Sequence, residues 1–524
     1  MGGSSSSART DSHRPSHGSL TEGLTQSWNC LINGFREPEI VVRRRPLPLE
    51  EPKFSLTPLI LRRVRKFQPV SAQSLRLAVK ERYHFVSIDL LFLLQLGADV
   101  NGLVVNPDKK AVQKNLKESA LHLAAEMGNV ACVNTLLHFG AHPNVRDTTR
   151  ETALMRASSR GFSEVVAALL SVQTVRRRPV TVDVNAAGAL GGETALLYAA
   201  KNGSVLVVRL LLLVNAQVNL RDNYGWTALM EAALHNHLDV LNTLIDARAD
   251  VNGLVVNPDK KAVQKNLKES ALHLAAEMGN VACVNTLLHF GAHPNVRDTI
   301  GETALMRASS RGFTEVVAAL LSVQTVRRRP VTVDVNAAGA LGGETALLYA
   351  AKNGSVLAVR LLLLVNAQVN LRDNYGWTAL MEAALHNHLD VLNILIDARA
   401  DVNAADSEGR SAALHLASEK GLTRVVETLL KADAKVDLEN RDGWTTLMYT
   451  SKNGKAEVVK LLVDAHANVN TRSRDGWSSL RFAESNGHSE IVKTLVRSPS
   501  WRQKRMTTMR ECEGSLRTAI DQRR

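Results

Sequence analysis

Internal repetition limits the architecture of this chain more than any other feature. Residues 98–252 recur as residues 249–403, with five differences in 155 aligned positions. Within these blocks a threonine or serine opens a shorter unit, and eleven such openings, Ser411 among them, stand mostly 33 residues apart, with steps of 42 or 43 at three junctions. Fixed periods of this length are typical of solenoids, in which each unit contacts only its neighbours.

Each unit has the sequence of two short helices. In one of them Thr227 is a suitable N-cap, because its hydroxyl can accept an early backbone N–H. Leu229, Ala232 and Ala233 then form a narrow apolar stripe that lets neighbouring helices approach closely. Nine residues after the cap comes glycine or asparagine, here Asn236, which tolerates the left-handed conformation that ends a helix. Since no unit can bury its apolar faces alone, we expect the units to stack.

Three recurring motifs carry a resemblance to a known family. They are Ser119-Ala-Leu-His-Leu-Ala-Ala125, Gly225-Trp-Thr-Ala-Leu-Met230 and Gly97-Ala-Asp-Val-Asn101. Residues 117–497 resemble the ankyrin-repeat family through them, and residues 72–101 resemble a degenerate first repeat. The resemblance implies an all-α solenoid of stacked helix-turn-helix units with short β-hairpin fingers, spanning residues 72–497. It also implies a role as a protein-binding scaffold, and we expect a monomer.

The two ends differ from the array. Residues 1–71 form a mostly disordered basic region by composition, and residues 498–524 form a basic C-terminal tail, also expected to be disordered. Gly2 lies in an M-G-x-x-x-S myristoylation pattern, although an ordinary glycine- and serine-rich tail is the simpler interpretation. No run of 18 apolar residues exists, so we expect no transmembrane segment. We expect a cytoplasmic protein, with nuclear entry as the alternative that the basic clusters favour.

A partner surface follows from the family's geometry. The residue before each opening threonine and the residue four after it should line the concave face and the adjoining fingers. Aromatic and charged side chains at such positions are good binding anchors. These positions hold Trp226, Trp377, Trp444, Trp477, Tyr198, Tyr349, Tyr449, Glu231, Glu382, Arg156 and Arg307. Tyr224 and Tyr375 stand at the expected turn tips. The alternative for the tryptophans is packing on the adjacent finger.

Basic insertions suggest a second kind of partner. Residues 175–184 and their copy, residues 326–335, lengthen two links, and their alternating valines predict a strand in a projecting hairpin. The arginines that they carry are Arg176, Arg177, Arg178, Arg327, Arg328 and Arg329. With a net charge of +13, they favour binding to nucleic acid or an anionic surface as the alternative function. Such binding would weaken steeply with salt.

The sequence offers no chemistry that an enzyme would need. Phosphate-binding loops, metalloprotease helices, nucleophile elbows and kinase signatures are missing, and so are cysteine or histidine clusters with metal-ligand spacing. We therefore predict no catalytic residues, no metal and no cofactor. His122, His273 and His415 stand where the motif of the ankyrin-repeat family has a histidine. The resemblance implies that these side chains form hydrogen bonds between repeats.

Overall fold

The computed structural model describes residues 71–80, 88–105, 117–172, 174–175, 178–189, 191–255, 268–322, 325–326, 329–407 and 412–521. The chain divides into two units, residues 1–62 and 63–524, and every described residue lies in the second. The predicted disorder of residues 1–70 and the candidate lipidation site Gly2 therefore lie outside the described residues.

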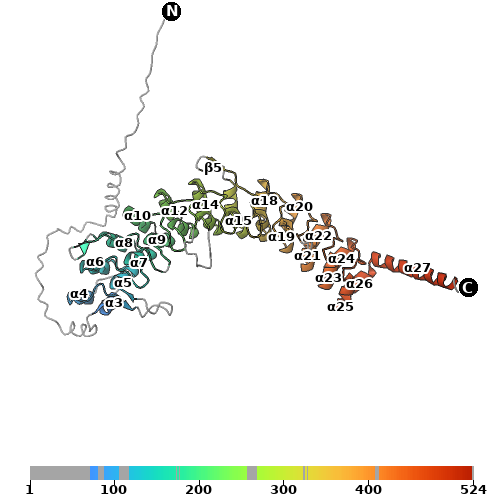
Figure 1. Cartoon of the computed structure of the whole chain (residues 1–524), viewed down its shortest axis with the longest axis horizontal. Coiled ribbons are helices and arrows are strands. Elements are labelled where there is room, and N and C mark those ends of the chain that lie inside the picture. The colour runs from blue at the N-terminus through green and yellow to red at the C-terminus, as the bar shows by residue number, and fades with distance from the viewer. Residues whose placement is uncertain are drawn as a thin grey trace, which may run out of the picture. The chain divides into compact units, whose positions relative to one another are not determined.

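The described part is built almost entirely from helix pairs that follow one another in chain order (Figure 1). We call the first helices of the pairs the first row and the second helices the second row. From α5 to α26, each helix contacts its own partner and the next helix of the same row. The predicted all-α repeat architecture is thereby confirmed.

The first row begins with α3 (Ala72–Lys80). It continues with α5 (Ala120–Glu126), α7 (Ala153–Arg160), α9 (Ala195–Asn202), α11 (Ala228–Leu234), α13 (Ala271–Glu277), α15 (Ala304–Arg311), α17 (Ala346–Asn353), α19 (Ala379–Leu385), α21 (Ala413–Lys420), α23 (Thr446–Lys452) and α25 (Ser479–Ser485).

The second row begins with α4 (Ile88–Gln95), which pairs with α3 as the degenerate first repeat predicts. It continues with α6 (Val130–His138), α8 (Ser163–Leu170), α10 (Val205–Leu213), α12 (Leu238–Asp246), α14 (Val281–His289), α16 (Thr314–Leu321), α18 (Val356–Leu364), α20 (Leu389–Asp397), α22 (Thr423–Lys431), α24 (Ala456–Asp464) and α26 (Ser489–Arg497).

The C-terminal end differs from the prediction. Instead of a disordered tail, residues Pro499–Asp521 form helix α27, which packs against α26. Pro499 suits the first helical position, and the Ser498 hydroxyl accepts a hydrogen bond from the Trp501 backbone N–H (3.4 Å). Trp501 also packs against the core of the array. The prediction was wrong because polar composition was given more weight than these start signals and the apolar anchor.

Helix ends follow the predicted chemistry in most repeats. The Thr152 hydroxyl accepts from the Met155 backbone N–H (3.3 Å), and Gly161 ends α7 at a φ of +76°. In the repeat assigned to Ser411, however, the N-cap is Ala412, whose side chain cannot accept a hydrogen bond. The cap moves by one residue because Gly421, the left-handed end of α21, fixes where that helix lies.

The core lies where the two rows meet. Leu229, Ala232 and Ala233 of α11 are buried as predicted, and the same positions are buried in the duplicated copy. Hydrogen bonds reinforce the contacts between repeats. His122 accepts from the Ser119 backbone N–H at Nδ1 (3.2 Å), so its Nε2–H donates to the Glu151 carbonyl of the next repeat (3.0 Å). His122 and His273, which bonds the Glu302 carbonyl (3.2 Å), thus make the predicted hydrogen bonds between repeats, whereas Nε2 of His415 is buried without a hydrogen-bond partner.

Short hairpins occur at the insertions, but their strands are formed by other residues than those predicted. Strands β1 (Val104–Val105) and β2 (Lys117–Glu118), β3 (Thr174–Val175) and β4 (Arg178–Pro179), and β5 (Thr325–Val326) and β6 (Arg329–Pro330) form antiparallel pairs. The alternating valines predicted a strand over residues 180–184, but these residues form none. Val182 and Val184 instead pack against the core, which is what their alternation reflects.

Candidate partner-binding surface

The exposed face of the first row gathers the predicted binding positions. Positions seven and eight after each N-cap stand three and four residues after position four, so their side chains share its face of a short helix. In α7 these positions are Arg156, Ser159 and Arg160, and in α9 they are Tyr198 and its neighbours Lys201 and Asn202. We call this the first-row face, and its side chains interact from one repeat to the next.

Arg156 is the centre of an ionic network on this face. Its guanidinium lies 2.7 Å from a carboxylate oxygen of Glu126, 2.7 Å from one of Asp147 and 2.6 Å from one of Glu151. Arg160 adds a contact of 3.1 Å to Glu126. The Arg156 side chain is only 9% exposed, and burial acts to lower its pKa. The surrounding carboxylates outweigh this effect, so the pKa of Arg156 is raised and its guanidinium stays protonated.

The duplicated block repeats the network around Arg307, with one difference. Arg307 contacts Glu277, Asp298 (2.6 Å) and Glu302 (2.9 Å), and it also contacts Glu269 (3.1 Å). The residue equivalent to Glu269 in the first copy is Glu118, which pairs instead with the buried Arg76 of α3 (3.2 Å). Two nearly identical blocks thus differ where their preceding repeats differ.

The two predicted tyrosines of this face are held by the same networks. The Tyr198 hydroxyl donates to Glu151 (2.7 Å), and the Tyr349 hydroxyl donates to Glu302. Burial, followed by the adjoining carboxylate, raises the pKa of both hydroxyls, so they stay protonated as donors. Their rings are half-buried, which leaves part of each available on the face.

Glu231 and Glu382 are buried acids with incomplete hydrogen bonding. One oxygen of Glu231 lies 3.8 Å from the Lys201 ammonium, and the other, Oε2, accepts no hydrogen bond although it is buried. Glu382 lies 3.8 Å from Lys352, and its Oε2 likewise accepts none. Burial raises the pKa of both carboxyl groups, Lys201 and Lys352 oppose this effect, and nearby carboxylates add to it.

The predicted tryptophans are half-buried and partly used in packing. Trp226 and Trp377 lie against the core. Trp444 contacts the rings of Tyr449 (5.0 Å between centroids) and Phe482 (4.6 Å), and Trp477 also packs on Phe482 (4.9 Å). The rings that Trp444 and Trp477 contact lie on helices α23 and α25, whereas the alternative interpretation placed the tryptophans on the adjacent finger.

Other predicted residues are exposed at turns or lie where side chains are not described. Tyr224 and Tyr375 are 53% and 64% exposed at the turns before α11 and α19. Arg178 and Arg329 belong to the hairpins β3–β4 and β5–β6, but their side chains are outside the described part. The remaining arginines of these hairpins, Arg176, Arg177, Arg327 and Arg328, lie outside the described residues altogether.

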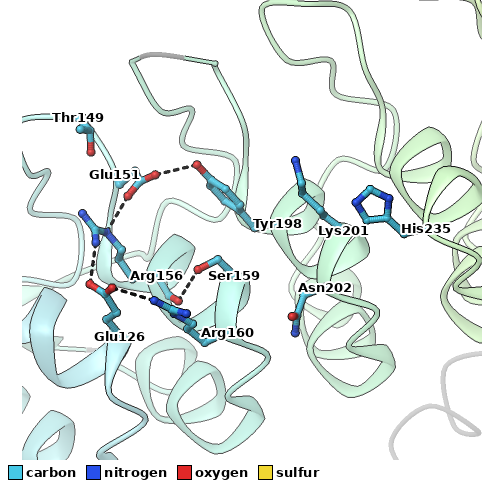
Figure 2. Close-up of a pocket in the computed structure, with 10 residues that line it drawn as sticks. All are labelled: Glu126, Thr149, Glu151, Arg156, Ser159, Arg160, Tyr198, Lys201, Asn202 and His235. Atoms are coloured by element: carbon cyan, nitrogen blue, oxygen red, sulfur yellow. Dashed lines mark hydrogen bonds and ion pairs between the residues drawn. The ribbon is translucent and has the colours of Figure 1, made fainter. Parts of the chain in front are cut away.

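A pocket of about 500 Å³ opens on the first-row face between α5, α7, α9 and α11. Figure 2 shows Glu126, Arg156 and Arg160 on one side of it and Lys201 and His235 on the other, with Tyr198 reaching toward Glu151. The sequence prediction rested on the residue before each cap and, within the helix, on the position four after it, so most of these residues were not predicted. Positions seven and eight, which share the face of position four, would have revealed Glu126, Ser159, Arg160, Lys201, Asn202 and His235.

The described residues contain no group of three or more histidine, cysteine, aspartate or glutamate side chains that could hold a metal ion. Within the same part of the chain no helix is both long enough and apolar enough to cross a bilayer.

Stacked, capped helix pairs with a 33-residue period and a polar, solvent-facing first row define a helical repeat protein. The chain matches the family model for ankyrin repeats (3 copies) over residues 75–178, 180–254, 251–330, 330–406 and 414–504. These matches cover most of the sequence, and the protein belongs to the ankyrin-repeat family. Ankyrin repeats are protein-interaction modules.

Several curated relatives share single stretches of the array. The chain is 40% identical over 128 residues to ankyrin repeat and KH domain-containing protein mask-1 of Caenorhabditis elegans, which is 24% of this chain and 5% of that protein. It is 38% identical over 105 residues to ankyrin repeat and SOCS box protein 3 of Homo sapiens, 20% of this chain and 19% of that protein. It is 28% identical over 209 residues to the putative ankyrin repeat protein YahD of Escherichia coli, 40% of this chain and 97% of that protein. The chain thus spans a small fraction of the first two.

Proposed function

We propose that this protein is an interaction scaffold that binds a protein partner through the first-row face. One observation carries the proposal: half-buried tyrosines, buried charges and a pocket of about 500 Å³ lie on a single face formed by successive repeats. Affinity on such a surface comes from a few anchors surrounded by weaker contacts. We expect the hairpin fingers to add to the contact area.

The duplication supports a repeated mode of binding. Arg156, Tyr198 and Glu231 recur as Arg307, Tyr349 and Glu382, with the same partners for the tyrosines and the same lysine distance for the glutamates. Two equivalent surfaces on one chain can raise avidity when a partner engages both. The scaffold would therefore suit a partner that itself carries a repeated motif.

A steric block tests which face is used. Asn202 and Asn353 are exposed on the first-row face, and Arg209 and Arg360 are exposed on second-row helices of the same repeats. We expect Asn202→Trp with Asn353→Trp to abolish capture of specific proteins from nuclease-treated lysate, as identified by mass spectrometry. The matched control, Arg209→Trp with Arg360→Trp, should capture the same proteins as the unmodified chain.

Two results would count against the scaffold. Equal loss with both pairs of substitutions would mean that the first-row face has no special role. Capture that depends on omitting nuclease, and that falls steeply with salt, would favour the alternative in which the arginine-bearing hairpins bind nucleic acid.

A further inference from the structure

The acids Glu231 and Glu382 lie in surroundings that are locally negative although the chain is basic. The carboxylates of Asp222 and Glu193 and the ammonium of Lys201 act on Glu231, so three carboxylates, that of Glu231 included, face one ammonium. Asp373 and Glu344 take the same places around Glu382, together with Lys352 and His386. The net charge of +13 therefore does not describe the surface at these two points.

The Glu231 carboxylate is buried but not satisfied. Its side chain is 9% exposed, and its Oε2 accepts no hydrogen bond. The nearest cations are the Lys201 ammonium, at 3.8 Å from Oε1, and the His235 ring, at 4.0 Å from Oε2, both beyond hydrogen-bond distance. Both of these residues line the pocket of the first-row face (Figure 2), so the carboxylate lies next to side chains of that pocket. Leaving such an oxygen without a donor is unfavourable.

The same chain shows what this scaffold does with a guanidinium at the equivalent position. Arg156 stands four residues after its N-cap, as Glu231 does, and Asp147 stands five residues before the cap, as Asp222 does. Asp147 uses one oxygen for the turn, accepting from the Glu151 backbone N–H (2.9 Å), and the other for Arg156 (2.7 Å). The scaffold thus builds a guanidinium site from carboxylates contributed by adjacent repeats.

At Glu231 the acids are present but the internal arginine is not. Asp222 makes the same turn, accepting from the Trp226 backbone N–H (2.8 Å), while position four after the cap supplies a carboxylate in place of the guanidinium. Lys201 does not replace that arginine, because its side chain is 55% exposed and its ammonium makes only a long contact. The carboxylates are therefore arranged for a cation that comes from outside the chain.

We propose that Glu231 and Glu382 are two equivalent acceptors for basic side chains, arginine above all, of a protein partner. The proposal rests on the first-row face being the binding face. Arginine is favoured over lysine because its planar guanidinium donates two parallel hydrogen bonds to one carboxylate. The guanidinium takes the place of the Lys201 or Lys352 ammonium, whose exposed side chain swings into solvent.

Binding of a fluorescein-labelled hexa-arginine peptide to the full chain, measured by fluorescence anisotropy, tests the proposal. We expect E231Q with E382Q to weaken binding by about tenfold or more, because each substitution removes charge-assisted hydrogen bonds to the peptide and the two losses add. The matched control is E164Q with E315Q, which removes the same charge from exposed positions on α8 and α16 and should leave the dissociation constant nearly unchanged.

A second pair of variants moves the affinity in the opposite direction and so excludes misfolding as the cause. K201Q with K352Q removes the competing ammonium groups and should tighten binding several-fold. R209Q with R360Q removes the same charge from second-row helices and should have a much smaller effect. A hexa-lysine peptide should bind more weakly than hexa-arginine.

Equal weakening by E231Q/E382Q and E164Q/E315Q, or no change with either, would overturn the proposal. So would equal tightening by K201Q/K352Q and R209Q/R360Q, which would show only the effect of net charge. The tryptophan block on the first-row face is a separate measurement. If it still abolishes partner capture while the peptide results are negative, the scaffold function stands and the basic partner does not.

Discussion

Replacing Arg156 by methionine would remove the cation from a buried network while keeping most of the side-chain volume. Glu126, Asp147 and Glu151 would then face one another without the guanidinium that lies 2.6–2.7 Å from each of them. Asp147 would be affected most, because its side chain is fully buried. Glu126 would retain Arg160, and Glu151 would retain the Tyr198 hydroxyl.

The magnitude follows from the burial of the pair. Removing one partner of a buried ion pair costs about 3–5 kcal/mol, because the remaining charge is left without compensation. We expect Arg156→Met to lower the free energy of unfolding of the surrounding repeats by that amount. Arg160→Met is the matched control, since Arg160 is 58% exposed and makes one contact of 3.1 Å, and it should cost less than about 1 kcal/mol.

The loss should depend on pH with a definite sign. Without Arg156 the pKa values of the abandoned carboxyl groups would rise above their unfolded values of about 4. An acid whose pKa is raised on folding destabilises the folded state at high pH, and the penalty disappears below the unfolded pKa. The difference between variant and unmodified protein should therefore be full at pH 7 and should shrink as the pH falls toward 4.

Urea unfolding followed by circular dichroism, with amide hydrogen exchange to locate the change, measures these quantities. Exchange matters because a repeat array can open locally, so the effect should concentrate in α5, α7 and α9. A loss with Arg156→Met no larger than that with Arg160→Met would refute the reasoning. A loss of the same size at pH 4 and pH 7 would show that the cause is packing and not charge.

Three further predictions test the local structure. Burial lowers the pKa of His122, so its contribution to stability should be full above pH about 6.5 and decline at lower pH; His122→Gln should reduce the fall in urea midpoint between pH 7 and 5. Gly203→Ala should cost at least about 1–2 kcal/mol in urea unfolding, since φ is +75° and the new Cβ would meet the His237 ring at 2.5 Å. Ala412→Ser should raise the stability of α21 by about 1 kcal/mol in hydrogen exchange, because it supplies the missing cap; unchanged protection would contradict the assigned N-cap.

The sequence predicted most of the fold because the determining interactions are local and recur. Thr152 as a cap, Gly161 as a left-handed helix end and the buried Ala232 stripe are each visible within one repeat. Predictions failed where a contact outside the local pattern decides the structure. Trp501 anchors α27 on the array, and Val182 packs on the core instead of extending a hairpin.

The binding face was predicted less well for a related reason. Position four after each cap pointed to Arg156, Tyr198 and Glu231, but not to their surroundings. Glu126, which bonds Arg156, lies 30 residues earlier, and Glu151, which bonds Tyr198, lies 47 residues earlier. The first separation is the 33-residue period less three positions, so position seven of the preceding repeat would have given it. The second includes the insertion between Thr152 and Thr194, so a fixed period does not give it.

The duplication shows most directly how neighbouring repeats determine local chemistry. Glu118 and Glu269 occupy identical places in two blocks that differ at five of 155 aligned positions. Yet Glu118 pairs with Arg76 of the preceding first-row helix, α3. The first-row helix before Glu269 is α11, which contains no arginine, and Glu269 pairs with Arg307 instead. In a solenoid each interface is made by two repeats, so copying a block preserves the contacts inside it and replaces those at its edge. The acids of the first network are therefore balanced by three arginines (Arg76, Arg156 and Arg160) and those of the second by two (Arg307 and Arg311), so the second is the more acidic of the two.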